Sequence, residues 1–247
     1  MKEIRELMGM RTTVDIVDAA ATQKDLNEVF EYFVYIDNTF STYKPDSELS
    51  RFNNGHIRKQ DLSEDMKTVM QLCEDTNEET HGYFNALKSG IYDPSGLVKG
   101  WAMMNCADLI RKKDFEQYYV EAGTDAQVNS KDHHKKWEVG IRNPFNIDEI
   151  LKVVYVRNQG VATSGTYIRG NHLYNPHLSG EKITDIVSLT VIGPNIYEAD
   201  RFSTAAFAMG RMGIQFIENL PQMEGYMIDK NGIAVYTTGF MQFTKPK

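Results

Sequence analysis

Hydrophobic residues recur with two different periods in this chain, and the order of the two periods restricts its fold. Spacings of three and four residues predict helices over residues 23–39, 63–80, 98–112, 198–210 and 214–219. Alternating or β-branched stretches predict strands over residues 11–17, 118–122, 137–142, 151–157, 183–192, 225–228 and 234–238. Because helices and strands do not alternate regularly, we expect an α+β fold with mixed or antiparallel sheets and packed helices.

The length and charge of the chain exclude several classes of protein. The 247 residues fit a single domain over 1–247, with two interleaved lobes as the alternative arrangement. The net charge of −7 argues against a generic binder of nucleic acid or anionic membranes, because such proteins concentrate positive charge. No apolar run is long enough to span a bilayer. We therefore expect neither a nucleic-acid partner nor insertion into a membrane.

The N-terminal stretch and the cysteines give weaker indications. The first 18 residues, MKEIRELMGMRTTVDIVD, contain acidic residues and no apolar core of a signal peptide, so we expect a cytoplasmic protein, although a chain trimmed of its leader would look the same. Cys73 and Cys106 fall in helical patterns without metal-ligand spacing, and we expect buried thiols at both positions.

A carboxylate and a hydroxyl lie one turn apart in the stretch EADRFSTAAFAMG, residues 198–210. Residues at i and i+4 share a helix face, so Asp200 and Thr204 can direct two hard oxygen ligands at one Mg²⁺ or Ca²⁺ ion. The alternative is structural: Asp200 caps the helix, and Thr204 bonds back to the carbonyl four residues earlier. Taken alone, the segment favours the structural alternative, because helix caps are common.

Several turn-rich stretches are not explained by packing. In STYKPDSELSRFN, residues 41–53, Ser47 or Asp46 predicts a helix cap, and an exposed binding loop is the alternative. The stretch DPSGLVKG, residues 93–100, precedes a helix and adds a lysine, which suits a phosphate. The stretch AGTD, residues 122–125, is typical of a turn. His172 lies beside another turn and can titrate near neutral pH.

Seven segments, taken together and in order, resemble the ApbE-type flavin transferases, the FAD:protein FMN transferases. The resemblance extends from about residue 10 to residue 210 and predicts an ApbE-like fold. The segments that carry it are STYKPDSELSRFN, DPSGLVKG, AGTD, WEVGIRNP, TSG, HLYNPHLSG and EADRFSTAAFAMG.

The resemblance implies a Mg²⁺-dependent enzyme with FAD as its substrate. Such an enzyme splits the FAD diphosphate, attaches FMN through a phosphoester to a Thr or Ser of a target flavoprotein, and releases AMP. Two alternatives stay open: an FAD diphosphatase that gives FMN and AMP, and a non-catalytic protein that binds or stores FAD. The sequence identifies neither the acceptor protein nor the oligomeric state.

The resemblance also implies roles for individual residues. The metal ligands are the side chains of Asp200 and Thr204 with the main-chain oxygens of Gly96 and Ser203. Lys99 contacts the FAD phosphates, and His172 acts as a general base or orients the diphosphate. The residues implied to bind the cofactor are Met10, Tyr43, Phe84, Asn85, Ala86, Asp93, Lys99, Ser164, His172 and Tyr174.

Some positions depart from the family pattern. Thr124 stands where the family has a glycine, and Asn85, Met104 and Asn175 stand where it has an acid. The absence of a carboxylate at positions 175 and 104 is expected to weaken substrate orientation or cofactor affinity. The two implied side-chain ligands of the metal, Asp200 and Thr204, are both present. The first methionine motif has two registers, one at Met10 followed by arginine and one at Met8 followed by glycine.

Overall fold

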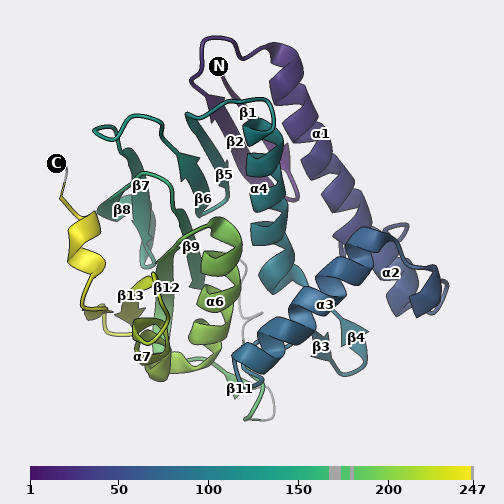
Figure 1. The fold of residues 1–247 in the computed structure, drawn as a ribbon. Helices are drawn as coiled ribbons and strands as arrows, with labels where there is room; N and C mark the ends of the chain where they lie inside the picture. The colour runs from purple at the N-terminus through teal and green to yellow at the C-terminus, as the bar shows by residue number, and fades with distance from the viewer. Residues whose placement is uncertain (167–173, 179–180, 246–247) are drawn as a thin grey trace.

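An eight-stranded antiparallel sheet forms the centre of the protein. The computed structural model describes residues 1–166, 174–178 and 181–245. In spatial order the strands are β1 (Lys2–Leu7), β2 (Met10–Ile16), β5 (Tyr118–Ala122), β6 (Asp125–Asn129), β9 (Gly160–Gly165), β12 (Ile186–Gly193), β13 (Glu224–Asp229) and β14 (Ala234–Tyr236) (Figure 1). Every neighbouring pair in this sheet is antiparallel.

In the part of the chain that the structure describes, three two-stranded hairpins supplement the central sheet. The longest pairs β7 (Trp137–Asn143) with β8 (Asn146–Val156). The two short ones pair β3 (Leu87–Lys88) with β4 (Ile91–Tyr92), and β10 (Tyr174–Asn175) with β11 (Glu181–Lys182). These hairpins are also antiparallel, so the expected α+β class with antiparallel sheets is confirmed.

The helices begin at side-chain caps in several places. Ser47, Ser63 and Asn195 each accept a hydrogen bond from a backbone N–H three residues later, which satisfies a donor that the first turn leaves unpaired. The α-helices are α1 (Gln23–Phe40), α2 (Glu48–Asn53), α3 (Glu64–Glu79), α4 (Ser95–Arg111), α6 (Ile196–Ala208) and α7 (Gly213–Glu218), and the 3₁₀ turns are η1 (Lys59–Asp61), η2 (Gly210–Met212) and η3 (Phe240–Phe243).

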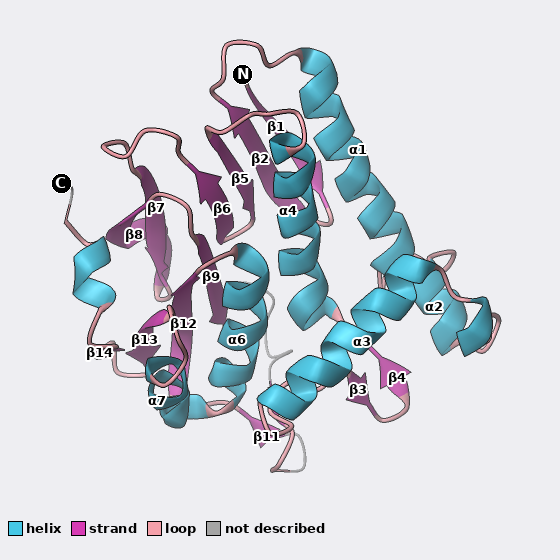
Figure 2. Ribbon diagram, viewed as in Figure 1, coloured by secondary structure: helices cyan, strands magenta, loops and turns pink. Residues whose placement is uncertain are grey.

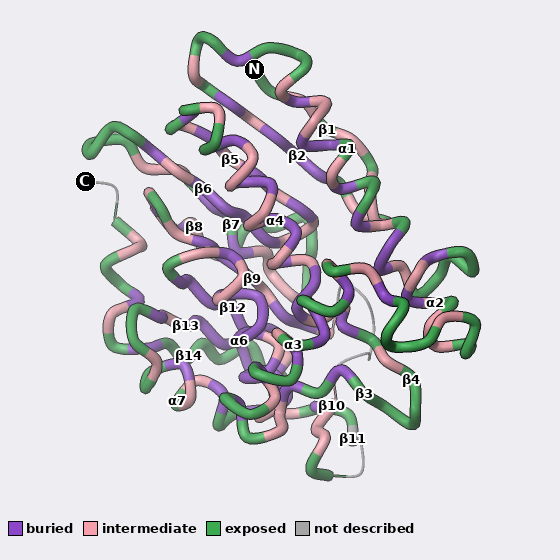
Figure 3. The backbone as a smooth tube through the Cα atoms, turned by 45° about the vertical axis from the view of Figure 1, so that its right-hand side comes forward, coloured by how far each residue is buried: buried purple, intermediate pink, exposed green. Residues whose placement is uncertain are grey.

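Helices and the long hairpin cover opposite faces of the sheet. Helices α4 and α6 stand side by side, with α1 and α3 outside them (Figure 2). Apolar residues of α1, α4 and α6 share one core with sheet residues such as Val120 and Val191, whereas α3 packs in a second apolar cluster. The β7–β8 hairpin packs Val139 and Val154 on Val128 of β6 in a separate core. Helix α6 lies almost wholly in the buried interior (Figure 3).

Glycines permit the closest contacts around α6. A Cβ atom at Gly100 of α4 would lie 2.6 Å from Asp200 Cβ and 2.8 Å from the Ile196 carbonyl oxygen of α6. A Cβ atom at Gly160 of β9 would lie 2.1 Å from the Ile196 nitrogen. Only glycine fits at both positions, and α6 is therefore held close to α4 and β9.

The structure corrects some predicted boundaries. The third helix starts at Ser95 instead of Val98, so the stretch expected as a turn before the helix forms its first turns. The TSG stretch, residues 163–165, forms the end of strand β9, where Ser164 contacts Ser203 of α6. The sequence patterns predicted no strand at β1, β6 or β9.

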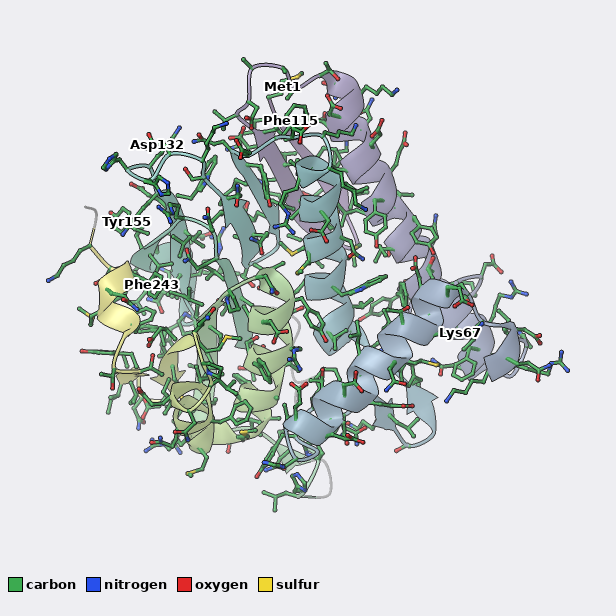
Figure 4. The ribbon with its side chains drawn as sticks, in the orientation of Figure 1. Met1, Lys67, Phe115, Asp132, Tyr155 and Phe243 are labelled. Atoms are coloured by element: carbon green, nitrogen blue, oxygen red, sulfur yellow. The ribbon has the colours of Figure 1, made fainter. Side chains whose placement is uncertain are left out.

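Side chains fill the space between the helices and the sheet (Figure 4). Cys73 and Cys106 are buried, as predicted, at 3% and 0% exposure. Within the described part of the chain, no helix combines the length and the apolar character needed to cross a membrane.

Candidate functional site

Asp200 and Thr204 face the first turns of α4. The Thr204 hydroxyl donates to the Gly96 carbonyl oxygen at 3.0 Å, and Asp200 Oδ2 accepts from the Gly100 N–H at 2.8 Å. Helix α6 begins at Ile196 with Asn195 as its cap, so Asp200 lies within the helix and does not cap it. The structural alternative is therefore wrong for Asp200, and the hydroxyl of Thr204 bonds to another helix instead of its own.

Lys99 lies between two carboxylates. Its ammonium is 2.6 Å from Asp125 Oδ2 and 3.6 Å from Asp200 Oδ1, and its side chain is 14% exposed. Asp125 is fully buried at the start of β6. Our sequence interpretation missed Asp125, because AGTD taken alone is typical of a turn. Asp125 could have been singled out because AGTD is one of the seven ordered segments that resemble the family.

Two serine hydroxyls join α6 to the sheet. Ser164 Oγ of β9 lies 2.9 Å from Ser203 Oγ, and the Ser203 hydroxyl donates to the Asp200 carbonyl oxygen at 3.0 Å. Ser203 is fully buried. The two side chains thus fix the helix next to the strand and leave Ser164 at the edge of the cavity described next.

A small cavity of about 150 Å³ lies over these groups. Lys99, Asp200 and Thr204 line it on the helical side, and Gly123, Thr163 and Ser164 line it on the sheet side. It shares Ser95, Gly96 and Thr204 with a hollow of about 250 Å³, and Met10, Ser95 and Lys99 with another of about 490 Å³. The three hollows meet at the N-terminus of α4 and form one groove with a polar centre.

The 250 Å³ hollow contains half of the residues predicted to bind the cofactor. Asn85, Ala86, Asp93 and Tyr174 line it with Phe84. The Phe84 side chain is only 2% exposed, so its ring belongs mainly to the core. Asp93 Oδ1 accepts from the Ser95 N–H at 3.0 Å, which gives this acid a structural role at the start of α4.

Tyr174 lies across this hollow from the β3–β4 hairpin. The Lys88 ammonium lies 3.8 Å from the centre of its ring, a cation–π contact that the sequence did not predict. Burial, and after it the negative charge of Asp93, raises the pKa of the Tyr174 phenol. The phenol therefore stays protonated at neutral pH and can donate a hydrogen bond.

The 490 Å³ hollow contains Met10 and Tyr43. Tyr43 is 95% exposed, so its ring is accessible to a molecule lying in the groove. Ser47 caps α2, as one of the two alternatives for this loop predicted, while Tyr43 lines the groove from the same loop. Gly9 and Met10 both line the central cavity, and Met8 and Gly9 form the left-handed turn between β1 and β2.

Two predicted site residues, His172 and Ser203, do not line the cavity through described side chains. His172 lies outside the described residues, and its catalytic role stays a prediction. Ser203 does not line the cavity through its side chain, and its predicted role as a ligand concerns the main-chain oxygen.

The departures from the family pattern have local explanations. Asn85 Oδ1 accepts from the Leu87 N–H at 2.8 Å, and Asn175 Oδ1 accepts from the His177 N–H at 2.9 Å. Both asparagines thus stabilise turns with the oxygen that an aspartate would use. Met104 packs against the main core, and the Thr124 hydroxyl lies 3.3 Å from Asp125 Oδ1.

The oxygen atoms around Thr204 fit a hard divalent cation. A carboxylate, a hydroxyl and a main-chain carbonyl come together from α4 and α6, and Mg²⁺ prefers oxygen ligands. The described residues contain no group of three or more His, Cys, Asp or Glu side chains with metal-ligand geometry. A cation held here would need oxygens from water or a bound phosphate, which is usual for Mg²⁺.

Comparisons with known proteins agree with these findings. The family model described as "ApbE family" matches residues 8–91 and 91–227. The FAD:protein FMN transferase of Haemophilus influenzae is 23% identical, over 92% of this chain and 86% of that protein. The enzyme of that name from Escherichia coli K12 is 26% identical, over 72% of this chain but only 54% of that protein. The crystal structure of the ApbE protein of Thermotoga maritima has a TM-score of 0.87 at 18% identity and covers 99% of each chain.

Proposed function

The chain belongs to the ApbE family, and from this premise we propose that it is a Mg²⁺-dependent FAD:protein FMN transferase. A Thr or Ser hydroxyl of a target flavoprotein attacks the FMN phosphorus of FAD. The new bond joins that oxygen to phosphorus, the bond to the bridging oxygen of the diphosphate breaks, AMP leaves, and the hydroxyl proton passes to a base.

The observation that carries the proposal is the groove with a polar centre and a hollow on each side. FAD has a diphosphate between two larger ends, and a centre lined by Lys99, Asp200 and Thr204 suits the diphosphate. The flanking hollows, which contain Tyr43 on one side and Tyr174 on the other, suit the flavin and adenosine ends.

Each group in the centre has a proposed task. Lys99 compensates charge on the phosphoryl oxygens, and the N-terminus of α4 adds its partial positive charge. The side chains of Asp200 and Thr204, with the main-chain oxygens of Gly96 and Ser203, would hold the cation. Bound Mg²⁺ would supply further charge neutralisation at the diphosphate. His172 is proposed to accept the hydroxyl proton or to orient the diphosphate.

The remaining cofactor contacts are also part of the proposal. Met10 and Tyr43 would contact one end of FAD, and Asp93, Ser164 and Tyr174 would contact the centre and the other end, together with the turn formed by Phe84, Asn85 and Ala86. A single domain over 1–247 and a cytoplasmic location stay predictions.

Incubation with FAD, with and without Mg²⁺, tests this function. We expect AMP release that requires the metal, with FMN recovered covalently on an added flavoprotein that offers an acceptor Thr or Ser. Lys99→Met is expected to abolish AMP release, whereas Lys67→Met, on the exposed surface of α3, is the matched control.

The other outcomes have distinct readouts. Free FMN with no labelled acceptor indicates an FAD diphosphatase. Protein that stays yellow with intact FAD after long incubation with Mg²⁺ indicates a storage protein. Absence of AMP at every metal concentration contradicts both catalytic activities.

A further inference from the structure

Asp125 is a fully buried carboxylate with a single cationic neighbour among the described residues. Its Oδ1 atom accepts from the Thr163 N–H at 3.0 Å and lies 3.3 Å from the Thr124 hydroxyl. Its Oδ2 atom has no hydrogen-bond donor of ordinary geometry in the described part of the chain and depends on the Lys99 ammonium, 2.6 Å away. A buried charge is costly unless it is paired, so Lys99 is held strongly.

Lys99 is thereby positioned unequally between two acids. Its ammonium is 2.6 Å from Asp125 but 3.6 Å from Asp200, a hydrogen-bonding distance on one side and a looser ion pair on the other. Asp125 belongs to a strand in the middle of the sheet, whereas the lysine side chain has four rotatable bonds. The carboxylate therefore determines where the ammonium lies.

We propose that Asp125 is a positioning residue that keeps Lys99 from neutralising Asp200 and so leaves Asp200 available to a divalent cation. The inference rests on the metal site of the proposed function and adds a residue that acts through Lys99. Without the charge of Asp125, the nearest carboxylate for the ammonium is Asp200. A carboxylate that is paired closely with an ammonium attracts a second cation less strongly.

Binding of Mn²⁺, used as a spectroscopic probe in place of Mg²⁺, tests the inference in the absence of FAD. Electron paramagnetic resonance titrations compare the wild type, Asp125→Asn, Lys99→Met and the double variant. We expect Asp125→Asn to weaken Mn²⁺ binding by about 10- to 100-fold, as changes to the partners of metal ligands do. Asp132→Asn removes the same charge from an exposed loop (Figure 4) and is expected to bind Mn²⁺ like the wild type.

The Lys99→Met variant distinguishes two effects of Asp125 on Mn²⁺ affinity: its positioning of Lys99 and the direct attraction of its own negative charge. If Asp125 acts through Lys99, the Asp125→Asn change has little effect on Mn²⁺ affinity when position 99 already carries Met. Melting temperatures without metal check the pair of Asp125 and Lys99. Both single variants should melt earlier than the double variant, because each single change removes one partner of this ion pair and leaves the other, whereas the double change removes both. Circular dichroism confirms that each variant is folded.

Three results would overturn the inference. These are an unchanged Mn²⁺ affinity in Asp125→Asn, an equal loss of affinity with and without Lys99, and a wild-type protein that binds no Mn²⁺. The proposed function is judged separately, by AMP release from FAD. If the wild type releases AMP but Asp125→Asn and Lys99→Met have additive effects on Mn²⁺ affinity, only the role of Asp125 is refuted. Mn²⁺ binding with the expected coupling but without AMP release refutes only the transferase.

Discussion

Single residues of the site have roles that a local pattern cannot assign. The four-residue spacing of Asp200 and Thr204 fits two explanations, a pair of metal ligands and a capped helix. The two explanations differ in which groups the two side chains contact. The structure places Asn195 at the start of α6, which leaves the Asp200 carboxylate for Gly100 and Lys99. The cap is thus a different residue, and the metal role of Asp200 and Thr204 stays a proposal.

Thr204→Val tests that role at a single atom. The substitution keeps the shape of the side chain but removes the hydroxyl that lies 3.0 Å from the Gly96 carbonyl oxygen. We expect Mn²⁺ affinity to fall about tenfold, equivalent to about 1.4 kcal/mol. Thr39→Val is the control, because Thr39 is a buried helical threonine whose hydroxyl donates to the Tyr35 carbonyl within α1. Equal Mn²⁺ affinity in both variants would argue against Thr204 as a ligand.

At the scale of elements, the site depends on how closely α4 and α6 approach each other. Gly96 and Gly100 lie one turn apart on α4, and both face α6. Glycine lowers helix propensity, so the sequence favours a later helix start than the structure has. Packing against α6 outweighs this cost, and it brings the Gly96 carbonyl to Thr204.

Gly100→Ala tests the importance of that approach. Alanine would favour the helix by about 1 kcal/mol if packing were unchanged. Its methyl group would lie 2.6 Å from Asp200 Cβ, so we expect the free energy of unfolding to fall by about 1–3 kcal/mol, as in other overpacked cores. Urea denaturation measures this free energy of unfolding, and Glu31→Ala on the exposed face of α1 is the control. A variant that is more stable than the wild type would contradict the close packing.

At the scale of the whole molecule, three apolar clusters among the described residues hold the elements together. The main cluster joins α1, α4 and α6 to the sheet and includes Cys106, and the second joins α3 to the groove segment near Phe84 and includes Cys73. Helix α6 belongs to both clusters, since Ala206 lies in the main one and Ala205 in the second, and the same helix lines the groove with Asp200 and Thr204.

The two thiols report on the integrity of these clusters. Burial raises the pKa of Cys73 to about 12 and that of Cys106 well above its ordinary value, and both side chains are inaccessible. Because the thiolate is the reactive form, we expect negligible reaction with Ellman's reagent at pH 8 in the native protein. In denaturant both thiols, the two that the chain contains, should react. A fast-reacting thiol in the native protein would contradict this packing.

Much of the fold could be predicted from the sequence where the pattern is long and regular. The predicted helix at 23–39 and the predicted strand at 118–122 agree with α1 and β5. The strands β6 and β9 were missed, because their small and polar residues, such as Gly160, are suited to close contact with α6 and carry little strand propensity.

The sequence by itself determined the α+β class, the buried cysteines and the ordered motifs that mark the family, because these depend on local periodicity and residue type. Only the tertiary structure decided that Asp125 pairs with Lys99, that Asn195 instead of Asp200 caps α6, and that Thr204 meets Gly96. Two of these contacts join residues far apart in the chain, and the third depends on the residue at which α6 begins. The contact between Thr204 and Gly96 also depends on glycines, because Gly96, Gly100 and Gly160 let α4, α6 and β9 approach closely.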